Sequence, residues 1–198
     1  MNKDKRLLII FYRNPELGKV KSRLAATVGE ERALAIYLLM AAHARKICIP
    51  IPVDKTVYYS EFIDLEDNWS NQDFKKRLQH GSDLGEKMKQ AFDESFNSGY
   101  ESVCIIGTDC LELAEDILVN AFQILQHKDA VIGPAVDGGY YLLGMTRYTP
   151  LLFNNKGWST SSVCKDTIED LRQLQYNYQL LPTLHDVDKE SDLPIHLR

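Results

Sequence analysis

The residues from Leu7 to Tyr12 form an unbroken apolar run that is rich in strand-forming side chains. Asn14, Pro15 and Gly18 follow, and residues of these types end strands and form loops. A short strand without a polar face is buried on both sides, which is typical of parallel sheets. This run therefore predicts a buried strand of a parallel sheet that continues into a loop.

Strand-like and helix-like segments alternate along the rest of the chain. Residues 63–79 are polar without a clean period and are expected to be irregular. The alternation predicts a doubly wound α/β sheet, whose ligands bind at the carboxyl ends of the strands. With 198 residues, the chain has the length of one domain, 1–198. The expected helices cover residues 30–47, 84–98, 114–126 and 162–175, and the expected further strands cover 56–59, 103–107, 130–133, 140–145 and 178–184.

The helix expected from residue 84 is preceded by Ser82 and Asp83, and either side chain could cap it. The spacing of apolar residues places Leu84 on the buried face of this helix. The same spacing places Leu38 on the buried face of the helix over residues 30–47. Both assignments follow from the helical period alone.

The charge balance excludes several classes of partner. The chain has 23 Lys and Arg against 28 Asp and Glu, a formal net charge of −5, which is the wrong sign for binding nucleic-acid backbone or anionic lipid. The apolar run behind the basic start Lys3–Arg6 is too short for a signal-peptide core or a membrane span, so we expect a cytoplasmic protein. The four cysteines form no C-x-x-C pair, so neither a disulfide nor a zinc site is expected.

The loop after the first strand, residues 13–24, gathers cations at the carboxyl end of a buried strand. Gly18 lets the backbone approach an anion, while Lys21 and Arg23 can contact phosphate oxygens as a point charge and a fork. The loop, which begins at Arg13, is therefore a candidate diphosphate cradle. The alternative is a solvated basic loop without a ligand.

Two acidic segments are candidate metal ligands. Asp109 follows the strand over 103–107 and could bind Mg²⁺ or Mn²⁺, which prefer oxygen ligands, or it could cap the next turn or helix. Asp186 and Asp188 share one face of an extended segment and could point at one ion, or they could belong to a solvent-exposed acidic loop.

The turn Asp137-Gly138-Gly139 offers a carboxylate that could meet an acceptor hydroxyl. Asp-Gly also commonly makes an ordinary hairpin turn, and that alternative stays open. Trp69 and Trp158 are interpreted from their residue type as packing residues.

Together these segments resemble a bacterial family of small glycosyltransferase-A-like proteins, described as uncharacterised or as selenodomain-associated transferases. The resemblance covers nearly the whole length and implies a single-domain nucleotide-diphospho-sugar transferase fold, with a mixed, mostly parallel sheet flanked by helices. It rests on six ordered blocks: Pro15-x-x-Gly18-x-x-Lys21-Ser22-Arg23-Leu24, Gln79-x-Gly81-x-Asp83-Leu84-Gly85-x-x-Met88, Gly107-Thr108-Asp109-Cys110, Gly133-Pro134-Ala135-x-Asp137-Gly138-Gly139-Tyr140-Tyr141, Trp158-Ser159-Thr160 and Asp186-Val187-Asp188.

The resemblance implies a nucleotide or nucleotide-sugar donor on the N-terminal half and a small-molecule acceptor on the C-terminal half. Asp109 and Asp188 would hold Mg²⁺ or Mn²⁺, and the expected catalytic residues are Lys21, Asp109 and Asp137. The residues expected at the nucleotide phosphates are Arg13, Gly18, Lys21, Arg23 and Asp83, and those expected at the acceptor are Asp137, Gly138, Gly139 and Trp158.

The chain departs from the family pattern at Leu111, where Pro is usual, and at Val136, where Glu is usual. The first loop is also distantly similar to that of the phospholactate guanylyltransferases, which use a nucleoside triphosphate and release pyrophosphate. Three functions follow: metal-dependent glycosyl transfer from a nucleotide-diphosphate sugar, nucleotidyl transfer from a nucleoside triphosphate, and nucleotide binding without catalysis.

Overall fold

A computed structural model of the chain describes residues 5–197, so Lys3 and Asp4 of the basic start lie outside the described residues. These described residues form one seven-stranded sheet with the strand order β3-β2-β1-β4-β6-β5-β7. The strands are β1 (Arg6–Tyr12), β2 (Asp54–Tyr59), β3 (Lys75–Leu78), β4 (Ser102–Ile106), β5 (Ala130–Pro134), β6 (Tyr140–Met145) and β7 (Tyr178–Leu180). The α-helices are α1 (Ser22–Val28), α2 (Glu30–Cys48), α3 (Leu84–Asn97), α4 (Glu115–Ile124) and α5 (Val163–Gln173).

The sheet is mixed and mostly parallel, which confirms the expected fold class. β6 runs antiparallel to both of its neighbours, β4 and β5, whereas the other paired strands are parallel. The carboxyl ends of β1, β2, β3 and β4 therefore meet at one edge of the sheet. Loops that follow these strands can bring their side chains together there.

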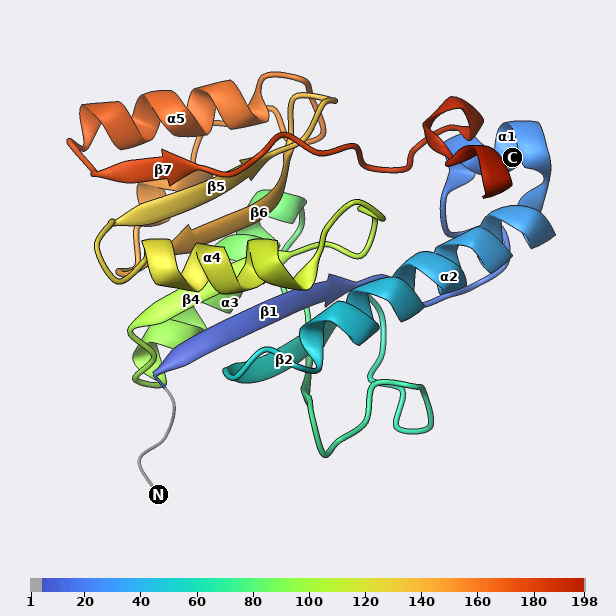
Figure 1. Cartoon of the computed structure of the whole chain (residues 1–198), viewed down its shortest axis with the longest axis horizontal. Coiled ribbons are helices and arrows are strands. Elements are labelled where there is room, and N and C mark those ends of the chain that lie inside the picture. Colours follow the sequence, from blue (N-terminus) through green and yellow to red (C-terminus); the bar gives the residue numbers. More distant parts are fainter. Residues whose placement is uncertain (1–4, 198) are drawn as a thin grey trace.

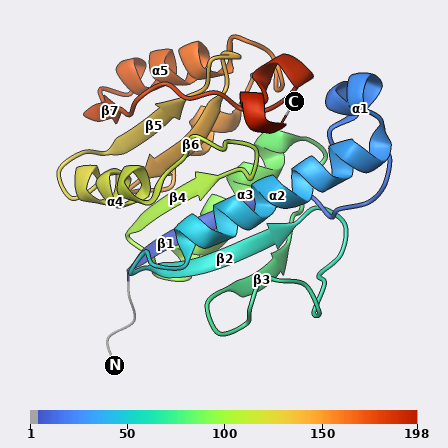
Figure 2. The ribbon, with the colours of Figure 1, turned by 45° about the vertical axis from the view of Figure 1, so that its right-hand side comes forward.

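Alternating residues of β1 enter two different cores. Leu8, Ile10 and Tyr12 pack with α1, α2 and α4 on one face, and Leu7 and Ile9 pack with α3 and α5 on the other. Figures 1 and 2 show α2 and α4 on one side of the sheet and α3 on the other. The buried strand inferred from Leu7 to Tyr12 is thus the central parallel strand of a three-layer fold.

Two elements were not expected from the sequence. β3 lies inside the segment 63–79, and it is an edge strand whose residues, Lys75 to Leu78, are exposed or only half-buried, so it lacks an apolar run. α1 begins at the end of the cationic segment 13–24 and has one fully buried residue, Leu24. Both elements are held by tertiary contacts that leave little trace in local composition.

The helical period placed two leucines wrongly. Leu38 is 45% exposed and Leu84 is 43% exposed. α2 is apolar on more than one side, and its buried side is the one with Ile36, Tyr37 and Met40. Leu84 is the first residue of α3 and lines the cleft described below.

The segment after β7 crosses the sheet toward α1 (Figure 1). Leu184 forms an isolated parallel bridge with Ala135, and the Val187 amide then donates to the carbonyl oxygen of Asp109 at 2.9 Å. This path carries the end of the chain to the carboxyl end of β4.

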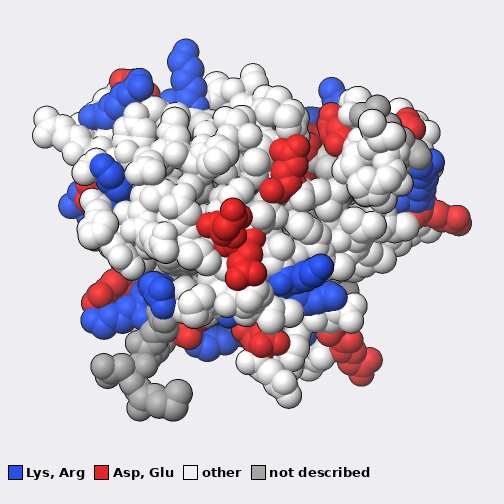
Figure 3. Space-filling view, in the orientation of Figure 1, with Lys and Arg blue, Asp and Glu red and all other residues white. Residues whose placement is uncertain are grey.

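Charged side chains are distributed unevenly on the surface. On the face drawn in Figure 3, acidic side chains gather near the middle and basic ones lie mostly toward the rim. Within residues 5–197, no helix has both the length and the apolar composition needed to cross a membrane.

Candidate functional site

A cleft of about 650 Å³ opens at the carboxyl ends of β1, β2, β3 and β4 and extends to the turn before β6. Gly18 and Gly138 are not among the residues that line it. Gly18 turns the first loop with a φ of 74°. The other residues expected at the site all line this cleft: Arg13, Lys21, Arg23, Asp83, Asp109, Asp137, Gly139, Trp158 and Asp188.

Lys21 lies at the centre of the candidate site. Its side chain is 6% exposed, and Nζ lies 2.8 Å from Asp109 Oδ2 and 3.6 Å from Asp188 Oδ1. Its backbone is left-handed, with φ 49°, and its carbonyl oxygen accepts the first hydrogen bond of α1 from Ala25 at 2.8 Å. α1, missed in the sequence, therefore fixes the direction of this lysine.

Asp109 is not a helix cap. α4 begins at Glu115 behind Ala114, with no side-chain cap, and the Asp109 carboxylate pairs with Lys21. Its side chain is 44% exposed and lines the cleft, so one side of the carboxylate faces Lys21 and another remains accessible to a ligand. The capping alternative for Asp109 is wrong.

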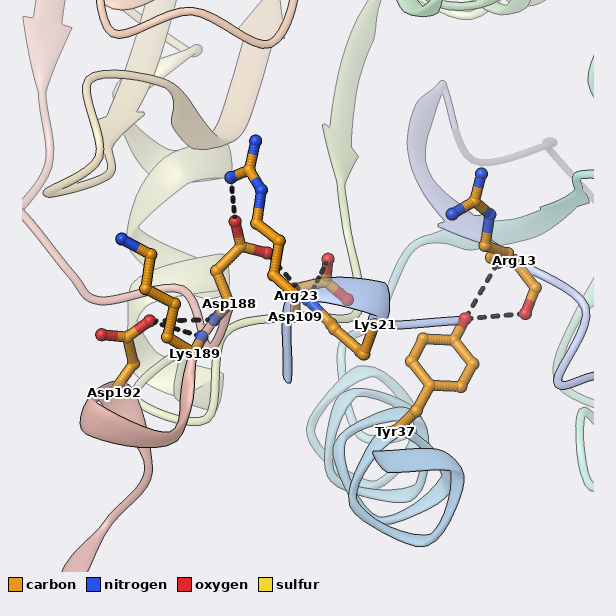
Figure 4. A network of polar contacts seen from close by, with 8 residues as sticks. All are labelled: Arg13, Lys21, Arg23, Tyr37, Asp109, Asp188, Lys189 and Asp192. Carbon is orange, nitrogen blue, oxygen red and sulfur yellow. Dashed lines mark hydrogen bonds and ion pairs between the residues drawn. The ribbon is translucent and has the colours of Figure 1, made fainter. Parts of the chain in front are cut away.

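Asp188 is held in place from two directions (Figure 4). Arg23 donates from Nη1 to Asp188 Oδ2 at 2.8 Å. The amides of Asp188 and Lys189 donate to Asp192 Oδ2 at 3.1 and 2.8 Å, which orders the turn that carries Asp188. Two carboxylates from distant parts of the chain thus converge on one cationic group.

Asp186 lies on the same segment and is partly buried in the cleft. Burial raises the pKa of its carboxyl to about 7, and the negative charges of Asp109, Asp137 and Asp188 add to this effect, while Lys21 opposes it. The floor of the cleft therefore holds more negative charge than Lys21 neutralises.

The raised pKa of Asp186 predicts a pH effect on stability. Because the folded pKa lies above the ordinary value of 3.8, the folded state keeps a proton that the unfolded state has lost, and stability falls as pH rises from about 4 to about 7. Asp186→Asn removes this contribution, so melting temperatures measured in chelator should shift in favour of the variant as pH rises. A constant difference between variant and wild type would contradict the expectation, and Asp116→Asn on α4 serves as the control.

The carboxylates of Asp109 and Asp188 suit a divalent cation whose remaining coordination positions are filled by a phosphate ligand. Mg²⁺ and Mn²⁺ in such sites commonly use one or two carboxylates together with substrate phosphates. Asp109 and Asp188 already converge on one positive charge, the Lys21 ammonium. Within residues 5–197, no three His, Cys, Asp or Glu side chains are placed to hold a metal ion by themselves.

The Asp137 turn combines both alternatives left open by the sequence. Asp137 Oδ1 accepts from the Gly139 amide at 2.8 Å, which makes a tight turn between β5 and β6, and the carboxylate also lines the cleft. Gly138 has a φ of 92°, and a Cβ there would lie 2.1 Å from the Ser161 carbonyl oxygen. Val136 is 58% exposed and is not among the cleft-lining residues, so the departure from Glu at this position lies outside the cleft.

Asp83 and Trp158 have structural roles at the cleft rim. Asp83 caps α3 by accepting from the Glu86 amide at 2.8 Å. Trp158 stacks on Phe153, with ring centroids 6.4 Å apart, and lies directly over Gly85. Trp69, by contrast, is fully buried, as the packing interpretation predicts.

Gly85→Ala should displace Trp158. A Cβ at position 85 would lie 2.1 Å from Trp158 Nε1, so the indole must move, although alanine suits the helix better than glycine. In a Trp69→Phe background, the fluorescence emission of Trp158 should shift to the red. Unchanged emission would mean that Trp158 does not rest on Gly85 in solution.

The residue that holds the start of the first loop, Tyr37, could not be recognised from the sequence. The Tyr37 hydroxyl donates to the Arg13 carbonyl at 2.7 Å and accepts from the Arg13 amide at 3.0 Å. The Arg13 side chain lines the cleft, and its guanidinium makes no hydrogen bond or ion pair with residues 5–197. In Figure 4 it lies at a distance from the group formed by Lys21 and Arg23. The four cysteines are buried and free.

The chain is similar to one protein family and to several solved structures. The family described as "Uncharacterized protein conserved in bacteria (DUF2064)" matches residues 38–160. A structure from Desulfovibrio desulfuricans G20, provisionally named a nucleotide-diphospho-sugar transferase, is 32% identical with a TM-score of 0.88, over 94% of this chain and 83% of that chain. No curated protein matches the chain by sequence.

More distant structures share the fold. The inositol-1-phosphate CTP transferase of T. maritima is 11% identical with a TM-score of 0.56, over 97% of this chain and 93% of that one. CMP:2-keto-3-deoxy-manno-octonic acid synthetase complexed with CTP is 8% identical with a TM-score of 0.54, over 94% of each chain. At these identities the likeness concerns the architecture alone.

Proposed function

The chain belongs to the DUF2064 family, and from this premise we propose that it is a metal-dependent transferase that moves a sugar from a nucleotide-diphosphate donor to a small acceptor. The observation that carries the proposal is the placement of Lys21 between Asp109 and Asp188 in a large cleft at the strand ends. Cations and carboxylates at one point suit a diphosphate that arrives with a divalent ion. The relative from D. desulfuricans, with its transferase name, supports the same reaction class.

Asp109 and Asp188 would hold Mg²⁺ or Mn²⁺, and the ion, when bound, supplies charge neutralisation at the diphosphate. Lys21 and Arg23 contribute positive charge from the protein itself. Each already touches one of these carboxylates, so each lies within reach of phosphates bound to the same point. Fixed charges directed at a leaving group are commonly the largest catalytic contribution in such sites.

The acceptor would occupy the other end of the cleft, beside the turn before β6. Asp137 lines this end and is the candidate ligand or base for an acceptor hydroxyl. Trp158 lines the same end and offers an apolar ring face for the body of a small acceptor. Its contact with Gly85 places that ring at the start of α3.

Nucleotidyl transfer is the second candidate. Four cations line the cleft, Arg13, Lys21 and Arg23 from residues 13–24 and Lys87 from α3, whereas Lys19 pairs with Glu16 at 2.9 Å outside it. Such a set of positive groups also suits a triphosphate, whose α-phosphate a phosphorylated acceptor would attack. The products differ, because glycosyl transfer releases a nucleoside diphosphate and nucleotidyl transfer releases pyrophosphate.

The test is a thermal-shift panel followed by product analysis. Nucleoside diphosphates, triphosphates and nucleotide sugars are each added with and without Mg²⁺ or Mn²⁺, since a ligand that binds only the folded state raises the melting temperature. We expect a nucleotide sugar with metal to give the largest shift and a nucleoside diphosphate to be released. Pyrophosphate release would favour the second candidate, binding without turnover would indicate a non-catalytic nucleotide-binding module, and no shift with any nucleotide would contradict both transferases.

A further inference from the structure

One end of the cleft is not used by the chemistry proposed above. Ser60 and Glu61 follow β2, and Gln79 follows β3, its parallel neighbour, and all three line the cleft. The Gln79 amide donates to the Tyr59 carbonyl at 2.8 Å, so the ends of the two strands are joined. We call these three residues, together with Phe11 at the end of β1, the base end of the cleft.

The backbone amides at the start of the loop after β2 already donate hydrogen bonds within the protein. Asn14 is 2% exposed, and its Oδ1 accepts from the amides of Glu61 and Phe62 at 2.9 and 3.3 Å. The Ser60 hydroxyl lies 3.3 Å from the same Oδ1 and can donate to it, and the Ser60 amide donates to the Tyr12 carbonyl at 3.0 Å. This loop therefore has no backbone donor left for a ligand at residues 60–62.

The side chains of Gln79 and Glu61, in contrast, have hydrogen-bond acceptors that are available to a ligand. Gln79 donates from Nε2 to the Tyr58 carbonyl at 2.8 Å, and no group in residues 5–197 donates to its Oε1. The Glu61 carboxylate is exposed, and it makes no hydrogen bond or ion pair with residues 5–197, although its charge acts on the Lys19 ammonium. The base end thus presents a carboxylate and an amide oxygen that accept hydrogen bonds, beside the second N–H of Gln79 Nε2, which donates.

The distance between the base end and the candidate phosphate site suits the span of a nucleotide, with its base at one end and its phosphates at the other. In the strand order β3-β2-β1-β4 (Figure 2), the ends of β2 and β3, which Glu61 and Gln79 follow, are two and three strands from the end of β4, which Asp109 follows. Neighbouring strands are about 4.8 Å apart, so the separation is roughly 10 to 15 Å. Phe11 lines the cleft and offers a ring on which a base can stack.

We propose that the base end selects guanine, so that the donor is a guanosine nucleotide. Guanine carries two neighbouring hydrogen-bond donors, N1–H and the 2-amino group, and the two oxygens of one carboxylate can accept a hydrogen bond from each of them. Adenine and cytosine each place a ring acceptor beside their amino group, and uracil has a single N–H between two carbonyls, so a carboxylate suits these bases less well than it suits guanine. The Arg13 guanidinium, which follows β1 and is unpaired within residues 5–197, suits the O6 and N7 acceptors of the same base.

This inference rests on the proposed function and is tested by calorimetric titration of the full chain with Mg²⁺ and GDP, ADP, UDP, CDP or xanthosine diphosphate. Wild type should bind GDP about 10- to 100-fold more tightly than the others, the discrimination of one good bidentate contact. Glu61→Gln should lose that preference and leave ADP, UDP and CDP unchanged. It should also gain affinity for xanthosine diphosphate, because the new amide donates to the 2-carbonyl of xanthine.

The outcomes separate this inference from the proposed function. Tight binding of another nucleotide would overturn guanine selection and leave the nucleotide site intact. An equal loss of all nucleotides in Glu61→Gln would assign Glu61 to the ribose or the phosphates, which also overturns it. Binding of no nucleotide by wild type would contradict the proposed function itself. Glu66→Gln, an exposed glutamate of the same loop that does not line the cleft, is the matched control.

Discussion

Replacing Asp109 by Asn should abolish metal-dependent nucleotide binding while leaving the fold almost unchanged. The substitution keeps the size of the side chain but removes one of the two carboxylates that converge on Lys21. Loss of a partner outside the first coordination shell typically costs 10- to 100-fold in metal affinity, so loss of a direct ligand should cost more than about 100-fold. The measurement is calorimetric titration of a nucleoside diphosphate with and without Mg²⁺.

Stability should change little in this variant. Asp109 is 44% exposed, and Lys21 keeps Asp188 as a partner. The substitution therefore leaves the buried Lys21 ammonium paired, and the half-exposed Asp109 should contribute no more than about 1 kcal/mol, or less than about 4 °C in the melting temperature of a chain of this size. Wild-type binding by Asp109→Asn would exclude the metal assignment, and a collapse of stability would give Asp109 a structural role. Asp116→Asn removes the same charge outside the cleft and should change neither quantity.

Lys21→Met should lose activity and become dependent on divalent cations for its stability. The lysine is the buried positive charge beside Asp109 and Asp188, and it is aimed at the site that the diphosphate would occupy. Removing one fixed group that stabilises developing charge typically lowers kcat about 100- to 1,000-fold. The two carboxylates would then repel each other and Asp186, so the melting temperature should fall in chelator and recover in Mg²⁺ more than that of wild type.

Lys19→Met is the matched control for this experiment. Lys19 lies in the same loop but is 64% exposed and pairs with Glu16 outside the cleft. It should therefore leave turnover and the response to Mg²⁺ unchanged. If Lys21→Met shows the same response to Mg²⁺ as wild type, the ammonium does not occupy the cation position and the placement of the ion must be revised.

Much of the fold could be predicted because several strands are recognisable in the sequence as short apolar runs. β1, β4 and β5 are short apolar runs, and the loops that follow β1 and β4 begin at the same edge of the sheet. That is why Lys21 and Asp109 could be assigned to one site. β3 could not be found in this way, because an edge strand needs no apolar run.

The rest of the site depends on contacts between distant segments. Asn14 reads in the sequence as the end of a strand, yet it is buried and organises residues 60–62. The raised pKa of Asp186 arises from burial, from the carboxylates of two other segments, Asp109 and Asp137, and from its neighbour Asp188. The left-handed backbone of Lys21 is set by the start of α1. No local pattern carries this information.

The central claim is that Asp109 and Asp188 hold a divalent ion on the diphosphate of a nucleotide. The most direct measurement is a crystal structure with Mn²⁺ and the nucleoside diphosphate that stabilises the protein most, with the ion located by its anomalous scattering. We predict one manganese peak in contact with Asp109, Asp188 and the diphosphate, with Lys21 turned from the two carboxylates onto the phosphates. A nucleotide bound elsewhere, or a peak away from both carboxylates while Lys21 still bridges them, would contradict the account.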